Sequence, residues 1–458
     1  MNKLAALRIG IGFLIALVSV DAYGDSKGDY WPTWRGPDAT GVTANGNPAL
    51  TWSETENIKW KVKLPGQGTS SPIVWADRIF FQTAIKTDKK GTSAAQAGSE
   101  GRDPDGSGNA RRPFHGGRTP TNVYKFDLVC LDRKSGRILW QKTAREELPH
   151  EGHHPNHDGF ACYSLVTDGK HVWASFGSRG VHCYDMDGNH KWSRDMGKMR
   201  KKMLFGEGSS PALAGDAVIV VMDHEGDSFI YALNKKTGGT VWKKPRDEAT
   251  TWATPIVVAV NGKMQVVISA TKRIRSYDLE TGNLIWQCGG QTGNVIPSPV
   301  SGFGKVFCTS GFRGNALQAI ELGRTGDLTG SDAVSWQVDE ATPYVPSPLL
   351  YGDKIYVCSG NRAVVSCYQA KTGKANFVKQ QLEGMREIFA SPVGAANRVY
   401  FVGRDGVSQV IKRAEEFQVL ATNTLDDRFD ASPAIVGDEL FLKGKTYLYC
   451  IAEPREKR

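Results

Sequence analysis

An aromatic residue closes a short turn signature again and again along this chain. The aromatic falls four residues after a glycine in SGRILW, DGNHKW, TGGTVW, TGNLIW and TGKANF, which end at Trp140, Trp192, Trp242, Trp286 and Phe377. Two less regular copies end at Trp336 and Phe417, and Trp60 marks a lone strand before the first full unit. Most neighbouring positions are 40 to 52 residues apart. This period is typical of four-stranded propeller blades.

A second marker, at the opposite end of the unit, gives the same count. Ser-Pro or Thr-Pro opens seven units, at Pro72, Pro211, Pro255, Pro299, Pro348, Pro392 and Pro433. An eighth unit has Ser164 followed by Leu165. Because eight openings match eight aromatic closings, we expect an all-β, eight-bladed β-propeller of four-stranded antiparallel blades.

The two ends of the repeat predict how the ring closes. The last unit stops after its third strand, at residues 448–452, whereas the strand around Trp60 precedes the first Ser-Pro. We therefore expect this N-terminal strand to complete the last blade, which removes both sheet edges. A buried tryptophan is worth roughly 4 to 6 kcal/mol as an upper bound. The repeated tryptophans are accordingly interpreted as wedges between blades.

The segments before the propeller indicate export. Residues 1–24 carry Lys3, Arg8 and an apolar run, which are typical of a signal peptide too short to span a membrane. Residues 25–51 include the compact sequence WPTWRGP and should dock on the propeller, which occupies 52–458. We expect a periplasmic or secreted monomer with no transmembrane segment in the mature chain. The formal charge of +9 is modest for this length and predicts no nucleic-acid partner.

The eight cysteines fit the repeat better than they fit disulfides. Cys130, Cys183, Cys367 and Cys450 fall at one equivalent third-strand position, where other units have Ala232, Ser276 and Ala319. Cys308 and Cys358 share a second-strand position. Small buried residues suit such sites, so free packed thiols are favoured over an export-type disulfide framework.

Two segments interrupt the regular repeat. A polar stretch at about residues 86–122 lies in the first blade, where disorder or a mobile lid is expected. The loop LPHEGHHPNHDGF follows that blade and holds His150, His153, His154 and His157. These imidazoles could bind a transition metal, or they could belong to a polar surface loop. Strand parity places both segments on one face of the ring.

That face also gathers cations and aromatic side chains. Turns between second and third strands carry Arg179, Arg273, Arg313, Arg362, Arg404 and Lys445. Blade connections add Trp252, Tyr344, Phe389 and Phe429. A ring of cations would attract anionic ligands or acidic protein surfaces, or it could simply keep exposed hairpins soluble. The aromatic residues could anchor a partner or fill the channel mouth. Asp223 and Glu225 form the acidic exception and are the candidate cation ligands.

The Ser-Pro opening, Gly-Asp hairpin and TGxxxW closing together resemble the quinoprotein-type repeat of pyrroloquinoline-quinone-like propellers, over residues 52–452. WPTWRGPDATG and HVWASFGSRGVHCYDMDGNHKW resemble exported members from planctomycete-type bacteria. The resemblance implies one of two functions. One branch consists of quinone-dependent alcohol and sugar dehydrogenases that bind the quinone and calcium on the axis. The other is the periplasmic propeller of the outer-membrane β-barrel assembly machinery.

The sequence favours the second kind of function. Many quinone alcohol dehydrogenases carry two adjacent cysteines against the cofactor, and no two cysteines are adjacent here. The leading hypothesis is a non-catalytic scaffold that requires no cofactor and binds a periplasmic or cell-envelope protein, or an anionic ligand, through its basic face. The alternative is a pyrroloquinoline-quinone-dependent and calcium-dependent oxidoreductase of alcohols or sugars.

Overall fold

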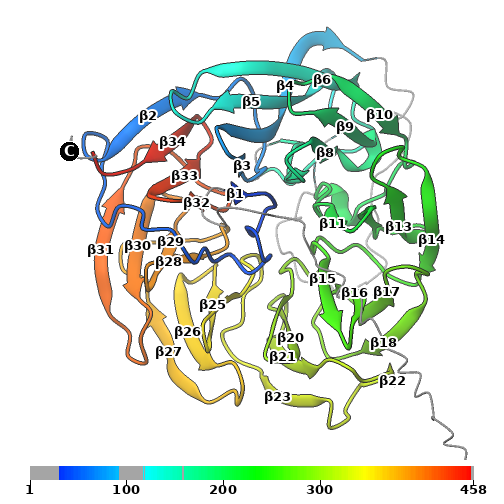
Figure 1. Ribbon diagram of the computed structural model, residues 1–458, viewed down its shortest axis with the longest axis vertical. Coiled ribbons are helices and arrows are strands. Elements are labelled where there is room, and N and C mark those ends of the chain that lie inside the picture. Colours follow the sequence, from blue (N-terminus) through cyan, green and yellow to red (C-terminus); the bar gives the residue numbers. More distant parts are fainter. Residues whose placement is uncertain (1–29, 92–116, 118, 157–158, 455–458) are drawn as a thin grey trace, which may run out of the picture.

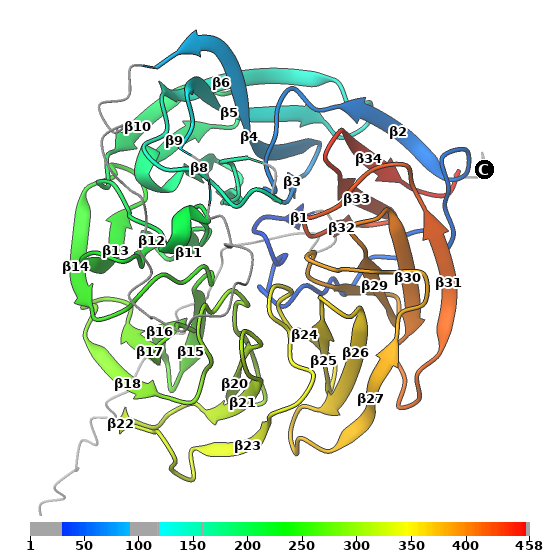
Figure 2. The same ribbon diagram turned by 180° about the vertical axis from the view of Figure 1, so that it is seen from behind.

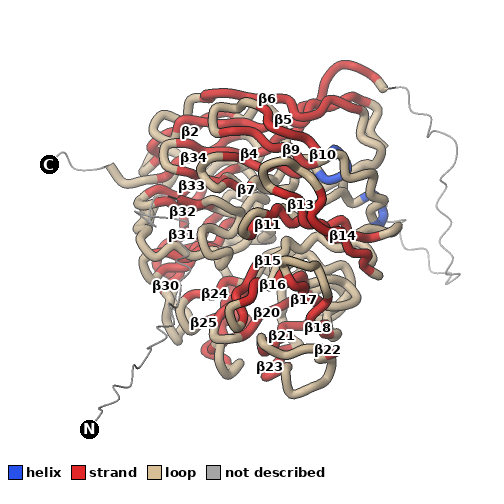
Figure 3. The backbone as a smooth tube through the Cα atoms, turned by 45° about the vertical axis from the view of Figure 1, so that its right-hand side comes forward, coloured by secondary structure: helices blue, strands red, loops and turns tan. Residues whose placement is uncertain are grey.

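Eight sheets are arranged as a ring around a central axis (Figures 1 and 2). The computed structural model describes residues 30–91, 117, 119–156 and 159–454, so the expected signal peptide and most of the polar insertion lie outside the described residues. Each blade has four antiparallel strands, ordered from the axis outward, and Figure 3 shows the ring from an oblique direction. The predicted eight-bladed all-β propeller is confirmed.

The strands of the first four blades follow the repeat units. Blade 1 comprises β3 (Ile73–Trp75), β4 (Arg78–Lys90), β5 (Asn122–Asp132) and β6 (Ile138–Glu147). Blade 2 comprises β7 (Val166–Thr167), β8 (His171–Ser175), β9 (Val181–Asp185) and β10 (His190–Arg194). Blade 3 comprises β11 (Ala212–Ala214), β12 (Ala217–Met222), β13 (Ser228–Asn234) and β14 (Thr240–Arg246). Blade 4 comprises β15 (Ile256–Val260), β16 (Lys263–Ile268), β17 (Ile274–Asp278) and β18 (Leu284–Cys288), and β22 (Gly326–Asp327) pairs in parallel with its outer edge.

The remaining blades have the same plan. Blade 5 comprises β19 (Val300–Gly302), β20 (Lys305–Ser310), β21 (Ala316–Glu321) and β23 (Val334–Val338). Blade 6 comprises β24 (Leu349–Tyr351), β25 (Lys354–Ser359), β26 (Val364–Gln369) and β27 (Ala375–Gln381). Blade 7 comprises β28 (Val393–Ala395), β29 (Arg398–Val402), β30 (Val407–Lys412) and β31 (Val419–Thr424). Blade 8 comprises β32 (Ala434–Val436), β33 (Glu439–Lys443), β34 (Tyr447–Ile451) and β2 (Ile58–Lys63).

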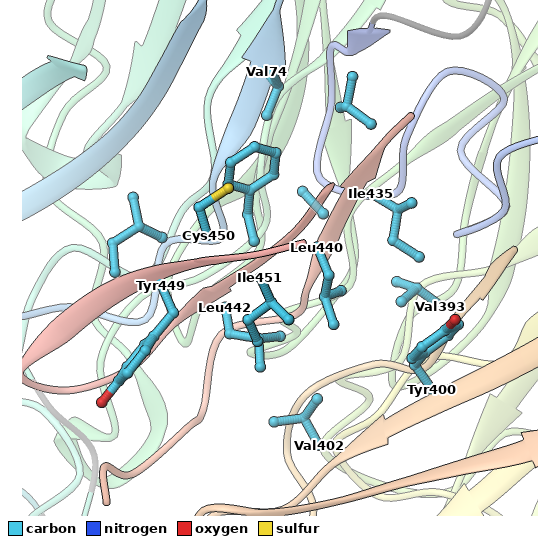
Figure 4. Packing of buried hydrophobic residues seen from close by; sticks show 14 of the residues in the cluster. Val74, Val393, Tyr400, Val402, Ile435, Leu440, Leu442, Tyr449, Cys450 and Ile451 are labelled. Carbon is cyan, nitrogen blue, oxygen red and sulfur yellow. The ribbon is translucent and has the colours of Figure 1, made fainter. Parts of the chain in front are cut away.

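The ring closes through blade 8, as the sequence predicts. Strand β2 pairs antiparallel with β34, with Trp60 opposite Cys450. A continuous cluster of buried side chains joins blades 7, 8 and 1 across this closure, including Val74, Tyr400 and Leu440 (Figure 4). The closure is therefore packed as a hydrophobic core as well as hydrogen-bonded.

A closed ring of hydrogen bonds explains why each unit opens with Ser or Thr. At the inner edge of every blade, the backbone N–H of this residue donates to the hydroxyl oxygen of its counterpart in the next blade. The circuit runs Ser71, Ser164, Ser210, Thr254, Ser298, Ser347, Ser391, Ser432 and back to Ser71, with distances of 2.8 to 3.0 Å. The following proline needs no ladder partner at this strand start. We call this circuit the hydroxyl ring.

A second contact between blades explains the glycine-to-tryptophan spacing. The indole Nε1 of Trp242 donates to the Leu279 carbonyl of blade 4 at 2.8 Å, and its ring covers Gly282 of the same turn. The same bond from a blade's tryptophan to the next blade's turn is made by Trp60, Trp140, Trp192 and Trp336, at 2.9 to 3.0 Å. The wedge interpretation is confirmed, and the glycine of each signature serves the tryptophan of the preceding blade.

The irregular repeats depart from this contact in informative ways. Phe417 is not the closing aromatic of blade 7, because Ala421 takes that register opposite Val410. Phe417 instead lies in the turn of blade 7 and packs edge-on against Phe377 of blade 6, with centroids 5.5 Å apart. Blade 6 closes with Phe377, which is smaller than tryptophan. Blade 7 has Phe417 at the turn position where the regular units have glycine, and this larger side chain packs against Phe377.

The cysteine positions follow the expected register. Cys130 pairs with Trp140 across β5 and β6, and Cys183, Cys367 and Cys450 hold the equivalent position in their blades. All eight cysteines are free thiols, and seven of them are buried. The four third-strand cysteines fill space beside the closing aromatic, as Ala232, Ser276 and Ala319 do in other blades.

The N-terminal segment runs along the inner ends of several blades. Strand β1 (Tyr30–Trp31) adds to β3 as the innermost strand of blade 1. Arg35, only 4 % exposed, donates to the carbonyls of Pro392 and Pro348 at 2.8 and 3.0 Å. No carboxylate pairs with it within the described part of the chain, and burial lowers the pKa of its guanidinium to about 9. The segment is thus pinned to blades 6 and 7.

Candidate binding face

The order of the strands places two kinds of loop on the same side of the ring. Turns between second and third strands and the connections between blades share what we call the connection face; the other turns lie on the turn face. Contacts agree with this placement, since Arg179 of the blade 2 turn reaches Glu207 of the following connection at 3.1 Å. Arg404 of the blade 7 turn similarly reaches Asp430 at 2.6 Å.

The channel mouth on the connection face is partly covered by the histidine loop. The carbonyl of Asn156 in this loop accepts hydrogen bonds from Arg404 of blade 7, at 2.9 Å, and from Arg428 of the connection between blades 7 and 8. The connection between blades 2 and 3 joins the same cover, because His154 N–H donates to the Phe205 carbonyl at 3.2 Å. Gly117, at the end of the polar insertion, donates to the Met203 carbonyl at 3.0 Å. Gly117 of the insertion and the histidine loop therefore both contact the connection between blades 2 and 3, on the face that strand parity predicts.

Several of the expected basic residues are already neutralised by carboxylates. Arg179, 6 % exposed, lies in η1 (Gly177–Arg179) between Glu207 and Glu147 and over the Phe126 ring. Arg404 pairs with Glu387 and Asp430. Arg273 pairs with the half-exposed Asp327 at 3.0 Å. These three cations hold loops together, which differs from the simple cationic ring that the sequence indicates.

The other three basic residues are exposed to solvent. Arg313 lies over the ring of Phe312 at 5.3 Å, and Arg362 is in the turn of blade 6. Neither is paired with a carboxylate within the described part of the chain. Lys445 is also exposed, and its N–H donates to the Arg428 carbonyl. The accessible positive charge of the predicted set is thus concentrated around blades 5 and 6, with Lys445 apart on blade 8.

The four aromatic candidates divide between packing and surface. Phe429 is fully buried in the closure core, and the guanidinium of Arg404 covers Phe389 at 3.9 Å. Trp252 donates from its indole to the Gly206 carbonyl and is partly exposed. Tyr344, also partly exposed, lies against Phe312 with centroids 5.1 Å apart. Phe429 therefore belongs to the core alternative that the sequence left open.

The acidic exception in blade 3 is occupied by a buried ion pair. Both oxygens of Asp223 accept from Arg246, at 2.7 and 3.0 Å, and both side chains are fully buried. One oxygen also accepts from the Thr251 hydroxyl at 2.7 Å. Glu225 accepts the Thr250 N–H at 3.1 Å. The lone pairs of Asp223 are thus engaged by donors within the protein.

The described histidines of the loop contact the backbone and aromatic rings. His150 Nε2 bonds the Met199 carbonyl at 2.7 Å, and His153 lies edge-on against Phe160. His154 Nδ1 accepts from Asn156 N–H at 3.2 Å. His157 lies outside the described residues. Across the residues the structure describes, no three His, Cys, Asp or Glu side chains come together as a metal site.

A buried lysine beside this network was not found from the sequence. Lys201, 3 % exposed, donates to the carbonyls of Asp223 and Thr251 at 2.6 and 3.0 Å, and its ammonium lies 5.4 Å from the Trp252 ring. Burial lowers the pKa of Lys201 to about 8, although surrounding carboxylates oppose the shift. Its partners come from two other blade loops, so no local motif could reveal the site.

A strained turn next to Lys201 was also missed. In η2 (Lys202–Leu204), Met203 and Leu204 have φ values of +51° and +54°, which cost bulky residues roughly 1 to 3 kcal/mol each. Bonds from Gly117, Lys202 N–H to Thr250, and Trp252 to Gly206 hold this turn. The turn leaves the Met203 side chain 45 % exposed.

The strained turn is connected to the exposed cation of blade 5. Lys202 Nζ donates to the Asn294 side chain at 3.1 Å, and Asn294 also hydrogen-bonds Tyr344. Tyr344 lies against Phe312, and the guanidinium of Arg313 lies over the Phe312 ring. We call Met203, Phe312, Arg313 and Tyr344 the mouth patch. It combines an apolar tip, two aromatic rings and an unpaired cation beside the part of the mouth that the histidine loop covers.

The fold is similar to solved propellers of several kinds. BamB from Moraxella catarrhalis is 15 % identical, with a TM-score of 0.52 over 70 % of this chain and 91 % of that one. Quinohemoprotein alcohol dehydrogenase from Comamonas testosteroni is 10 % identical, with a TM-score of 0.59 over 94 % and 82 %. The C-terminal WD40 domain of Sif2 is 11 % identical, with a TM-score of 0.52 over 89 % and 100 %. At these identities the likeness concerns the fold alone.

Sequence comparison identifies the family. No curated protein matches the chain significantly. No helix within the described residues is long and apolar enough to cross a membrane. A family profile described as "Outer membrane protein assembly factor BamB" matches residues 87–225, 124–379 and 226–454, well over half of the chain. The chain therefore belongs to this family of pyrroloquinoline-quinone-like β-propellers.

Proposed function

We propose that this protein is a non-catalytic scaffold of the cell envelope that holds a protein partner on its connection face. The observation that carries the proposal is the mouth patch, where a clamped turn with unfavourable backbone angles exposes Met203 and is linked, through Lys202 and Asn294, to Tyr344. Strained backbone is retained where the surroundings impose it, and it clusters at functional sites. Aromatic residues and arginine are the commonest anchors of protein interfaces.

The chemistry of the patch indicates the partner. Burial of the 45 % of Met203 that is exposed would contribute about 1 kcal/mol, which suits one anchor of an interface and is weak for sole attachment to a lipid surface. Arg313 and Arg362 have no carboxylate partner in the described part of the chain, so they favour an acidic surface opposite them. The expected partner has an apolar pocket rimmed by Asp or Glu.

Export supports the same proposal. Residues 1–24 have the composition of a signal peptide, and the family is described by an outer-membrane assembly factor. We place the protein in the periplasm or outside the cell on these grounds.

Photo-crosslinking tests the scaffold proposal. Benzoyl-phenylalanine at position 203 of the full chain, expressed in its own cells, should give one discrete adduct with an envelope protein. The same probe at Met264, which is 42 % exposed on the turn face, is the matched control. The charge reversals Arg313→Glu and Arg362→Glu should remove the adduct, whereas Arg137→Glu and Lys236→Glu, in turn-face loops, should leave it. Equal adducts from positions 203 and 264 would overturn the proposal.

The alternative function, quinone-dependent oxidation of alcohols or sugars, fits the described residues poorly. Arg35 and its segment line the inner ends of the blades on one side. On the connection face, the carboxylate oxygens of Asp223 accept hydrogen bonds from Arg246 and Thr251. Asp223 is therefore not available as a calcium ligand. Titration with pyrroloquinoline quinone and calcium should give neither a saturable change in tryptophan fluorescence nor dye reduction with alcohols or sugars. Saturable binding with turnover would replace the scaffold proposal.

A further inference from the structure

A groove on the outer rim lies between blades 3 and 4, away from the mouth patch. Its volume is about 510 Å³, and its walls come from β14 of blade 3 and from β17, β18 and adjoining turns of blade 4. These strands lie side by side at the rim in Figures 1 and 3. We call this cavity the rim groove.

Two short basic segments, distant in sequence, meet at the rim groove. The segment KKPR covers residues 243–246 at the end of β14, and KRIR covers 272–275 at the start of β17. Four of these cations line the groove, namely Lys244, Arg246, Arg273 and Arg275. The remaining polar lining consists of Asn283, Gln287, Tyr277 and one acid, Asp247. The wall therefore consists mainly of hydrogen-bond donors.

Buried carboxylates behind the wall fix two of the guanidinium groups. Arg246 is held by Asp223 and by the Tyr277 hydroxyl at 2.7 Å, while Arg275 bonds Glu248, whose side chain is fully buried. The Arg246 side chain has no exposed surface and that of Arg275 is 6 % exposed, so Arg246 lies behind the wall while Arg275 is held at the groove. Each guanidinium has five donors, and only some are used by these partners. Because the side chains are already ordered, a ligand would not have to immobilise them.

The other carboxylates near the rim groove are exposed and weakly bound. Asp247, which contacts Arg275, has a side chain 74 % exposed, and Asp327, which contacts Arg273, is 46 % exposed. Exposed pairs of this kind contribute little and are screened by salt. Lys244 pairs with no carboxylate in the described residues, and its ammonium donates to the Asn283 side chain at 3.0 Å. An incoming anion would compete with two solvated carboxylates while gaining ordered donors.

We propose that the rim groove binds the phosphate or sulfate group of an oxyanionic ligand, with Lys244, Arg273 and Arg275 as its donors and the buried Arg246 as a charge behind the wall. Planar guanidinium groups match the paired oxygens of such groups, and the ammonium of Lys244 adds a mobile charge. This site is separate from the mouth patch and does not depend on the scaffold proposal.

Calorimetric titration of the full chain tests the site with inorganic phosphate, inorganic sulfate and a heparin tetrasaccharide at low ionic strength. Saturable binding by at least one of the three is expected, and the tightest one identifies the oxyanion. The double variant Lys244→Gln and Arg273→Gln should weaken binding about tenfold or more, because it removes two charges from the wall. Its matched control, Lys134→Gln and Arg137→Gln, alters two cations of a turn-face loop in blade 1 and should bind normally.

A variant with the opposite sign makes the test sharper. Asp247→Asn removes the one acid in the lining, so the affinity should rise several-fold as the competing carboxylate is lost. Equal thermal midpoints for all variants would show that the fold is intact. The proposal is overturned if none of the three anions saturates the protein below 10 mM (about 2.7 kcal/mol of binding free energy), or if Asp247→Asn weakens binding.

Discussion

Gly282 has a backbone φ of +69° and lies beneath the ring of Trp242. A Cβ at this position would lie 2.6 Å from the indole, so the position excludes any side chain for steric reasons as well as conformational ones. Four other turn glycines lie beneath the tryptophan of the preceding blade in the same way, namely Gly136, Gly188, Gly238 and Gly373. The spacing from glycine to tryptophan is therefore the spacing between two contacts, one with each neighbouring blade.

Gly282→Ala separates these two constraints when it is compared with Gly304→Ala. Gly304 has a φ of +70° but no heavy atom within 4 Å of its would-be Cβ. Both variants should lose about 1 kcal/mol through left-handed strain, and Gly282→Ala should lose about 1 to 3 kcal/mol more by displacing Trp242. Urea denaturation measures both free energies of unfolding. Equal losses would show that the indole accommodates a methyl group.

Lys201 predicts a pH dependence of stability. Burial lowers its pKa from the ordinary value of 10.5 to about 8. Between these two values the unfolded lysine binds a proton that the folded lysine has released, so its contribution to stability rises with pH across this window. Relative to Lys201→Met, the wild-type protein should gain stability between pH 8 and pH 10.5. Denaturation of both proteins at several pH values tests this, and Lys236→Met, an exposed site, should show no such trend.

At the scale of elements, the hydroxyl ring defines where each blade begins. A proline at a strand start would by itself indicate little about the fold. The Ser or Thr before it, however, joins neighbouring blades through a buried hydrogen bond. The seven buried serines of the ring are at most 6 % exposed. The ring acts on the inner ends of the blades, whereas the tryptophan contacts act on the outer ends. Neighbouring blades that share both contacts are thereby fixed at two radii.

Ser298→Ala tests the hydroxyl ring. The substitution removes the acceptor of Thr254 N–H, and an unpaired buried N–H costs about 1 to 3 kcal/mol. Ser298→Thr keeps the hydroxyl, as blade 4 already does with Thr254, and should retain most of the stability. Thermal unfolding measures both effects. An alanine variant as stable as the threonine variant would mean that water replaces the hydroxyl.

The sequence predicts the elements well and the binding face only in part, for a physical reason. Periodic signals such as Trp140 and Ser210 recur because every blade solves the same packing problem, so they identify blade number, strand order and cysteine positions. The partners of Arg179, namely Glu207 and Glu147, come from loops with no common period. A pattern of turn residues can therefore reveal that a cation is present, but not that a carboxylate from another connection neutralises it. The same holds for Lys201 and Met203.

At the scale of the whole molecule, Arg35 links the N-terminal segment to the far side of the channel. Arg35→Met removes its bonds to Pro348 and Pro392 and should increase hydrogen exchange in residues 30–50 well before the blades exchange. Arg35→Lys keeps the charge but cannot bridge two carbonyls as a guanidinium does, so an intermediate effect is expected. Unchanged exchange in this segment would show that Trp31 and Trp52, both buried, suffice to hold it.

The closure in blade 8 bears on where the ends of the chain can lie in the ring. Ala452 N–H donates to the Asn57 carbonyl, so the outgoing end of the ring meets the incoming strand at the position where most other blades have a simple turn. In the closed ring, the junction between the third and fourth strands of blade 8 is equivalent to the same junction in the other seven blades. A circular permutant that joins residues 454 and 55 and opens at Lys371, in the equivalent turn of blade 6, should form the same eight-bladed ring. Its thermal midpoint should be lower, because it lacks Trp31 and Trp52 of the closure core.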